Sequence, residues 1–290
     1  MVVANDAPPL AGCGVLYVAT GEKYRLEAAG SARSLKAAMP ELPVALATDL
    51  ASLPTVDVKV VVTEDADGPF DLLVPVSDAR HEHGDKIAPL LRSPFERTLF
   101  LDSDTYVCRP FPELFAIAER FELAFCHDTW RQGFPMPVPS AFVHANSGVL
   151  LYRLTPAVRQ LFADWQALYW RMFDQGPRQV GEDWLGDQSP LQQVLWDSQV
   201  RFYVLPGEYN YRTWCANFVG ALGEVAIIHG RDADLPQLAR RLLPAERRPR
   251  VFLPSSEELF DGTLGFHRSR AQRRFLRAMR FETLLRKLFG

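Results

Sequence analysis

The chain has 290 residues, of which 48% are hydrophobic and 23% are charged, and its formal net charge at pH 7 is −3. This composition is typical of a soluble globular protein with enough apolar material for one large α/β domain or two small ones. The charge gives no sign of nucleic-acid binding, and no apolar run approaches the roughly 18 residues that a membrane-spanning helix needs. We therefore expect no nucleic-acid partner and no membrane span.

The amino terminus and the cysteines indicate a cytoplasmic protein. The first residues, MVVANDAPPLAG, lack the basic start and apolar stretch of a secretory signal peptide. No C-x-x-C pair occurs among the four cysteines, which are Cys13, Cys108, Cys126 and Cys215. Three of them lie in apolar surroundings, which predicts buried thiols in a reducing compartment.

Short apolar runs alternate with segments of helical periodicity along most of the chain. In chain order, the runs predict strands at 14–20, 43–50, 56–62, 98–102, 122–128, 147–154, 200–206 and 224–230. The periodic segments predict helices at 27–40, 85–93, 112–121, 155–173 and 187–198, and the proline-rich stretch 129–142 predicts a loop. Strands that alternate with helices favour a mostly parallel sheet covered on both faces.

Polar residues mark the ends of several predicted strands. In open sheets of this kind, ligands bind beyond the carboxyl ends of the strands. Five polar residues stand at or just past the end of an apolar run: Thr20, Asp49, Asp102, Asp128 and His229. Their coincidence indicates a ligand site at one edge of the sheet.

Asp102 and Asp104 directly follow an apolar run. Residues i and i+2 of an extended chain project to the same side, so the two carboxylates would point at one place. Such a pair repels itself unless one group is protonated or a cation lies between them. Two interpretations follow, a solvated turn ahead of the helix at Pro112 or a metal site. Oxygen ligands suit Mg²⁺ or Mn²⁺, and an added nitrogen from His229 would favour Mn²⁺.

Two other motifs compete with this interpretation. The stretch DSDTYV (102–107) also fits the start of haloacid-dehalogenase-type phosphatases, and GEDWLGD (181–187) imitates their later acidic motif. In those enzymes the D-x-D usually opens the domain, whereas here three predicted strands precede it. The stretch HEHGDK (81–86) is similar to the zinc motif of metallo-β-lactamases, but its last position is a lysine. We expect a solvated loop that leads to a helix there.

Five motifs, in order, resemble glycosyltransferases with the GT-A fold. They are RTLFLDSDTYVCRPFPELF (97–115), ANSGVLLYR (145–153), GDQSPLQQVL (186–195), LPGEYNYR (205–212) and IIHGR (227–231). The likeness covers residues 14–232 and is closest to glycosyltransferase family eight, which includes glycogenin and bacterial lipopolysaccharide galactosyltransferases. The resemblance implies an α/β fold of GT-A type, a mostly parallel mixed sheet flanked by helices, a UDP-sugar donor and a divalent metal, Mn²⁺ or Mg²⁺.

The resemblance also implies roles for individual residues. The metal ligands would be Asp102, Asp104 and His229, and the catalytic pair beside the anomeric carbon would be Asp187 and Gln188. The pair also fits a helix N-cap ahead of SPLQQVL. Donor-binding residues would be Ala19, Thr20, Gly21, Tyr24, Asp49, Lys86, Asp102, Ser103, Asp104, Asn146, Ser147 and Arg231.

The chain departs from the family pattern in two places. The family often continues after its histidine as H-x-x-G-x-x-K-P-W, and that lysine grips the diphosphate. Here the chain reads HGRDADLP, and Arg231 is the candidate substitute. Ahead of Tyr24, the family often has Asn or Asp where this chain has Gly21.

These features predict a metal-dependent, retaining glycosyltransferase that moves a hexose from a UDP-sugar. The sequence does not name the acceptor, which we expect to be a cell-surface glycan, a lipid-linked saccharide or a protein. The leaving diphosphate needs charge stabilisation by a metal, and a carboxylate such as Asp187 can stabilise the oxocarbenium-like carbon. The alternatives are a D-x-D phosphohydrolase and a nucleotide-sugar-binding protein without turnover.

We expect residues 1–265 to form a single GT-A-like catalytic domain and residues 266–290 to form a basic amphipathic helix. Between Arg240 and Gly290, thirteen Lys and Arg stand against five Asp and Glu. Apolar residues recur at i, i+3, i+4 and i+7 from Phe281. Two interpretations stand: the helix packs on the sheet with solvated arginines, or it lies on an anionic membrane as a peripheral contact near a lipid-linked acceptor.

Overall fold

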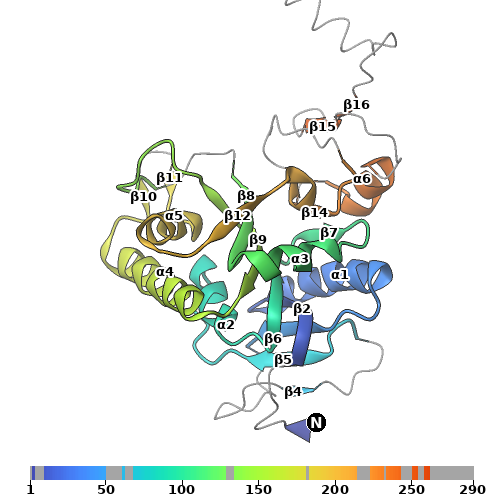
Figure 1. Cartoon of the computed structure of the whole chain (residues 1–290), viewed down its shortest axis with the longest axis horizontal. Coiled ribbons are helices and arrows are strands. Elements are labelled where there is room, and N and C mark those ends of the chain that lie inside the picture. The colour runs from blue at the N-terminus through green and yellow to red at the C-terminus, as the bar shows by residue number, and fades with distance from the viewer. Residues whose placement is uncertain are drawn as a thin grey trace, which may run out of the picture.

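The computed structural model (Figure 1) describes residues 2–3, 10–49, 61–62, 68–128, 134–180, 183–213, 223–231, 233–242, 250–253 and 258–261. Its main sheet has the strand order β1-β4-β5-β3-β2-β6-β9-β8-β12. In chain order these strands are β1 (Val2–Val3), β2 (Leu10–Val18), β3 (Val44–Thr48), β4 (Val61–Val62), β5 (Leu72–Pro75), β6 (Phe95–Leu101), β8 (Leu123–His127), β9 (Ala145–Arg153) and β12 (Phe202–Leu205).

The sheet is mixed, with a parallel centre. Strands β5, β3, β2 and β6 run parallel to one another, and β8 runs parallel to β12. Strand β9 is antiparallel to both of its neighbours, β6 and β8, and β4 and β1 are antiparallel additions at one edge. The predicted mostly parallel mixed sheet is confirmed. Because the central strands are parallel, β2, β3 and β6 all end at the same edge of the sheet.

Helices cover both faces of this sheet. Successive residues of a strand point to opposite faces, so Val15 and Tyr17 enter one core and Leu16 enters the other. Helices α1 (Glu22–Ala38) and α3 (Glu113–Arg120) pack on the first face. Helices α2 (Ile87–Leu90), α4 (Pro156–Gln175) and α5 (Gln188–Asp197) pack on the second, as Figure 1 shows. Burial on both faces explains why the strands read as continuous apolar runs.

A second sheet of three short strands lies beside the main one. It consists of β13 (Tyr211–Arg212), β14 (Ile227–His229) and β7 (Thr105–Val107), and β14 pairs antiparallel with β7. Helix α6 (Leu235–Leu242) packs against this sheet through Leu238 and Leu242. The remaining elements are two 3₁₀ helices (His83–Lys86 and Gly207–Tyr209) and two hairpins, β10 (Gln179–Val180) with β11 (Asp183–Trp184), and β15 (Arg250–Leu253) with β16 (Glu258–Asp261).

Several elements differ from their prediction. Helix α1 begins five residues early, at Glu22. The predicted helix 85–93 is a 3₁₀ helix followed by the single turn α2, because Pro89 lacks an N–H and the segment closes with short-range bonds from Leu91 and Arg92. Strands β5 and β7 and helix α6 were not predicted, since β5 and β7 are too short to show a period. Most of the predicted strand 56–62 lies outside the described residues.

The start of α4 follows its sequence signals. Thr155 caps the helix, because its Oγ1 accepts a hydrogen bond from the backbone N–H of Val158 at 3.3 Å. Pro156 occupies the first helical position, where its missing N–H has no cost. The helix extends to Gln175, close to the predicted end.

Three of the cysteines lie in the described part of the chain. Cys126 is buried, Cys13 and Cys108 are half-buried, and all three are free thiols. Burial raises the pKa of Cys108 to about 12, with a smaller opposite effect from the nearby Arg109. A thiol with such a pKa is a poor nucleophile at neutral pH. Cys215 lies outside the described residues.

Within the described ranges, every helix is too short or too polar to cross a membrane. The predicted basic helix 266–290 lies outside those ranges, as do residues 129–133 of the predicted proline-rich loop.

Candidate functional site

The two aspartates of the D-x-D lie in the turn between β6 and β7. Strand β6 ends at Leu101, and the backbone N–H of Asp102 still donates to the carbonyl of Gly148 on β9 at 2.8 Å. Thr105 then closes the turn by donating from Oγ1 to the carbonyl of Asp102 at 2.8 Å. The turn therefore carries both carboxylates at the edge of the sheet where the parallel strands end.

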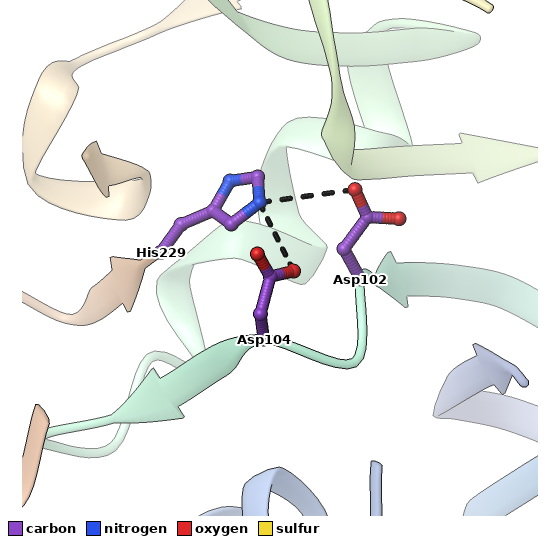
Figure 2. A group of neighbouring side chains, drawn as sticks. All are labelled: Asp102, Asp104 and His229. Atoms are coloured by element: carbon purple, nitrogen blue, oxygen red, sulfur yellow. Dashed lines mark ion pairs between the residues drawn. The ribbon is translucent and has the colours of Figure 1, made fainter. Parts of the chain in front are cut away.

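The small sheet brings His229 to these carboxylates. In the antiparallel pairing of β14 with β7, His229 is the partner of Thr105. Figure 2 shows Asp102 and Asp104 on one side of the imidazole ring. The Nε2 atom of His229 lies 3.3 Å from Oδ1 of Asp104 and 3.8 Å from Oδ2 of Asp102.

This arrangement fits a divalent metal ion. The three ligand atoms lie within 4.8 Å of one another. Ligands about 2.1 Å from one octahedral ion are separated by roughly 3 to 4 Å, and two carboxylates with one imidazole suit Mn²⁺ or Mg²⁺. Gly148 leaves the space in which these groups meet, because a Cβ there would lie 2.2 Å from Cε1 of His229 and 2.8 Å from Oδ2 of Asp102.

A chain of buried amides orients the imidazole. The backbone N–H of Gly148 can only donate, so Asn146 must present its oxygen there, at 3.0 Å. That oxygen also accepts from Nδ2 of Asn210 at 2.7 Å, which leaves the Asn210 oxygen 2.9 Å from Nδ1 of His229. Nδ1 therefore carries the proton, and the lone pair of Nε2 faces the two aspartates. This tautomer is the one that a metal ligand requires.

The same network continues to Gln188 at the start of α5. The Oε1 atom of Gln188 accepts from Nδ2 of Asn146 at 2.8 Å and from the backbone N–H of Ser147 at 3.2 Å. Its Nε2 donates to Asp128 at 2.7 Å, and Asp128 forms a buried ion pair with Arg212. Each end of the Gln188 amide thus has a partner, and its orientation is determined.

Lys86 links the D-x-D to Asp187. Its Nζ lies 3.2 Å from Asp102 and 3.0 Å from Asp187, and it donates to Oγ of Ser147 at 3.0 Å. Burial alone would lower the pKa of Lys86, but the two carboxylates outweigh it and raise that pKa. Burial likewise opposes ionisation of Asp187, yet the charge of Lys86 holds the pKa of Asp187 below its ordinary value. Both groups are charged at neutral pH.

The outer oxygen of Asp104 contacts a second cation. Oδ2 of Asp104 lies 3.0 Å from NH1 of Arg231. Burial favours the neutral acid, but His229 and Arg231 hold the pKa of Asp104 well below its ordinary value. Asp104 is therefore ionised and can serve as a ligand across the physiological pH range.

The loop from β2 to α1 forms the opposite end of the site. Gly21 has φ 80°, a left-handed conformation that favours glycine, and its N–H donates to Asp49 at 3.0 Å. Asp49, just past β3, also pairs with Arg25 at 2.8 Å. Tyr24 is 42% exposed. The ammonium of Lys23 and the guanidinium of Arg231 lie 5.3 and 5.7 Å from its ring centre.

A cavity of about 390 Å³ joins these groups. Most of the predicted site residues line it: Ala19, Thr20, Tyr24, Lys86, Asp102, Ser103, Asp104, Asn146, Ser147, Asp187, Gln188, His229 and Arg231. Gly21 and Asp49 do not line the cavity and instead shape the loop that precedes α1.

The stretch 81–86 agrees in part with its prediction as a solvated loop that leads to a helix, since His81 and His83 are exposed. His83–Lys86 form a 3₁₀ helix in which Gly84 and Asp85 are buried, and α2 follows directly. Asp85 accepts hydrogen bonds from the backbone of Arg80 and His81 at 3.0 and 2.7 Å and from Oγ1 of Thr20 at 3.3 Å. Sequence reasoning missed this role because the donors are mainly backbone groups. His81 and His83 line the cavity as well.

Two further residues of the site were missed. Asn210 lies within the quoted motif LPGEYNYR, so the motif offered a signal, but nothing in its spacing pointed to His229. Glu27 on α1 pairs with Arg231 across 204 positions of sequence and had no local signal at all.

Neither a protein-family model nor a curated protein matches this sequence. Solved structures do match it. The glycosyltransferase GlyE of Streptococcus pneumoniae superposes with a TM-score of 0.53 and 16% identity over 80% of this chain and 60% of GlyE. The galactosyltransferase LgtC, in complex with donor and acceptor sugar analogs, superposes with a TM-score of 0.52 and 16% identity over 79% of this chain and 96% of LgtC. The chain has the GT-A-type glycosyltransferase fold.

The chain spans only part of the length of some of these matched structures. The chain spans 60% of GlyE and 40% of the bifunctional glycosyltransferase WbbM, which matches at 14% identity with a TM-score of 0.47. In this chain the D-x-D follows the fourth of the parallel strands, since β2, β3 and β5 all precede β6. This order differs from the phosphatase pattern, in which the D-x-D opens the domain.

Proposed function

We propose that the protein is a metal-dependent, retaining glycosyltransferase that moves a hexose from a UDP-sugar to an acceptor. The observation that carries the proposal is the convergence of Asp102, Asp104 and His229 at the sheet edge of a GT-A fold. The fold likeness to LgtC, which was solved with donor and acceptor sugar analogs, supports a nucleotide-sugar donor and a glycan acceptor.

The ion would be held by Asp102, Asp104 and His229, with Mn²⁺ favoured over Mg²⁺ because one ligand is an imidazole. When bound there, it would act as a Lewis acid on the donor diphosphate as the anomeric bond breaks. Asn210 keeps the Nε2 lone pair of His229 directed at the ion site. Arg231, at the rim, adds a positive charge where the diphosphate would lie.

The donor would extend from Tyr24 to the buried end of the cavity. Tyr24 offers an exposed ring on which the nucleotide base can stack. Asn146 and Ser147 lie next to Gln188 on the cavity wall, where their polar groups can orient the sugar hydroxyls. Preorganised polar groups of this kind favour one pose of the sugar.

Asp187 and Gln188 would act beside the anomeric carbon. Asp187 is buried and ionised through Lys86, so it presents a negative charge that can stabilise an oxocarbenium-like carbon. Lys86 positions that carboxylate and connects it to Asp102. Retention is inferred from the family resemblance and is compatible with either a covalent intermediate or front-face attack.

One assay discriminates among the candidate activities. The protein is incubated with a panel of nucleotide sugars and Mn²⁺, and release of nucleoside diphosphate is followed with and without EDTA. We expect slow, metal-dependent hydrolysis of a UDP-hexose, with the product anomer identified by NMR. Cleavage of p-nitrophenyl phosphate instead would favour a phosphohydrolase, and calorimetric binding of UDP-sugars without turnover would favour a binding protein.

We extend the proposal to residues 266–290, which lie outside the described residues. Their basic, amphipathic pattern supports a helix that contacts an anionic membrane and brings a lipid-linked acceptor to the catalytic domain. Co-sedimentation with anionic and neutral vesicles, compared between the full chain and a chain that ends at Gly265, tests this. Salt-sensitive pelleting of the full chain alone is expected. Equal pelleting of both chains, or none, would contradict it.

A further inference from the structure

The rim of the cavity carries an ordered group of side chains around Arg231, which we call the rim cluster: Tyr24, Glu27, Ser103, Asp104 and Arg231. They come from α1, from the turn between β6 and β7, and from the residues after β14. The guanidinium carbon of Arg231 lies 5.7 Å from the ring centre of Tyr24. The cluster therefore extends from the predicted metal ligand Asp104 to the exposed ring of Tyr24.

Glu27 holds one edge of the Arg231 guanidinium. The Nε atom of Arg231 lies 3.2 Å from Oε1 of Glu27, and NH2 lies 3.0 Å from Oε2. This is the two-pronged geometry that an arginine forms with a carboxylate and that a lysine cannot form. Because the guanidinium is planar, a contact along one edge also sets the direction of the remaining N–H groups.

Ser103 holds Glu27 in turn. The hydroxyl of Ser103, the middle residue of the D-x-D, donates to Oε2 of Glu27 at 3.0 Å. Ser103 is buried and lies in a turn fixed by β6 and β7. The carboxylate of Glu27 therefore has a defined position relative to Asp102 and Asp104.

The charges and exposed fractions of the site indicate which cationic side chain a diphosphate can reach. The ion pairs of Lys86 and Arg231 join these two cations to four carboxylates, Asp102, Asp187, Glu27 and Asp104, so one divalent ion would make this ion-paired group neutral. A diphosphate then adds negative charge that needs a further accessible cation. Lys86 is 13% exposed and fully engaged with its partners, whereas Arg231 is 48% exposed. Arg231 is the accessible one of the two.

We propose that Glu27 is a positioning residue that holds Arg231 in place for the diphosphate of the nucleotide donor. The inference rests on the proposed function. Glu27 acts through Arg231 and does not touch the donor. Without it, the long side chain of Arg231 would sample many rotamers and would lose conformational entropy on binding the diphosphate.

The test compares ligands with and without a diphosphate. UDP and uridine are titrated by calorimetry into wild-type protein and the Glu27→Gln variant in the presence of Mn²⁺. Glutamine keeps the size of the side chain but loses its charge and one of the two acceptors. We expect UDP binding to weaken about tenfold, which corresponds to ~1.4 kcal/mol. Uridine binding should not change, because uridine has no phosphate for Arg231 to contact.

A matched control separates this effect from general loss of an ion pair. Glu119→Gln breaks another glutamate–arginine pair, with Arg97 at 2.8 Å, between α3 and β6. We expect that variant to bind UDP as the wild type does. In an Arg231→Ala background, Glu27→Gln should have no further effect on UDP affinity, since the two residues act as one unit. Glu27→Asp should restore part of the affinity.

The outcomes distinguish the two proposals. Wild-type protein that does not bind UDP with Mn²⁺ would overturn the proposed function. If the wild type binds UDP and Glu27→Gln binds it equally well or more tightly, only the role of Glu27 is overturned. Equal weakening of UDP and uridine would also overturn it, because that result indicates a general structural effect.

Discussion

At one end of the cavity, the imidazole of His229 is 7% exposed and the carboxylate of Asp104 is 8% exposed, and amides of Asn210 and Asn146 lock the ring in one tautomer. At the other end, Tyr24 is 42% exposed and lies in the first turn of α1, directly after a loop shaped by Gly21 and Asp49. We call these the D-x-D end and the β2–α1 end.

The two ends differ in burial because they would bind different groups, a metal ion at one and a nucleotide base at the other. Charged groups that converge on one ion repel each other unless their neighbours hold them, so the D-x-D end needs a buried network. A base that stacks on a ring needs an open surface, and a few contacts under the loop suffice. Changes at the D-x-D end should therefore have large effects on metal and turnover, and changes at the β2–α1 end should have smaller effects on the nucleotide alone.

The largest effect is expected from Asp102→Asn and Asp104→Asn. Each removes one anionic ligand, so we expect a loss of transfer or donor hydrolysis of roughly a hundredfold or more, together with loss of metal-dependent UDP binding. Circular dichroism should show an intact fold. A variant at either position with full activity in EDTA would refute the site.

Gly148→Ala should damage the D-x-D end without removing a ligand. The new methyl would lie 2.2 Å from the imidazole of His229 and 2.8 Å from Asp102, and one of them must move. We expect Mn²⁺ affinity, measured by calorimetry, to fall about tenfold or more. Gly30→Ala on α1 is the control, because a Cβ there meets nothing within 4 Å. Unchanged Mn²⁺ affinity in Gly148→Ala would show that metal binding does not need the space at Gly148.

Tyr24→Ala should affect the β2–α1 end only. Loss of the stacking surface should weaken binding of both UDP and uridine about tenfold. Tyr24→Phe keeps the ring and should bind both ligands like the wild type. Mn²⁺ affinity should be the same in all three proteins. A fall in Mn²⁺ affinity in Tyr24→Ala would mean that the two ends are not separable.

The smallest effect is expected from Asp49→Asn. Burial of Asp49 favours its neutral form, but the N–H of Gly21 and the charge of Arg25 outweigh it and hold the pKa below the ordinary value of 3.8. A depressed pKa stabilises the folded protein above the ordinary value, and this contribution is lost as the pH falls through the folded-state pKa. Asp49→Asn should therefore lower the urea midpoint slightly at pH 7. The difference in urea midpoint between Asp49→Asn and the wild type should become smaller below pH 4. A difference that becomes larger there would contradict the lowered pKa of Asp49.

Regular elements that bury a continuous stripe could be predicted from neighbouring residues. Helix α4 begins at Thr155 and Pro156 as its cap predicts, and β6 and β9 lie where the apolar runs indicate. Short elements could not be predicted. Strand β7 has three residues, too few to show a period, and it exists because β14 pairs with it.

The features of the site also fall into those that the sequence predicted and those that only the tertiary structure showed. The sequence by itself determined the D-x-D at the end of a strand, the α/β class and thirteen of the residues that line the cavity, because ordered motifs and strand ends are local features. Only the tertiary structure decided the orientation of the His229 ring, the ion pairs of Lys86, and the bond from Glu27 to Arg231 over 204 positions. Such contacts depend on register between distant segments, and no period in the sequence records them.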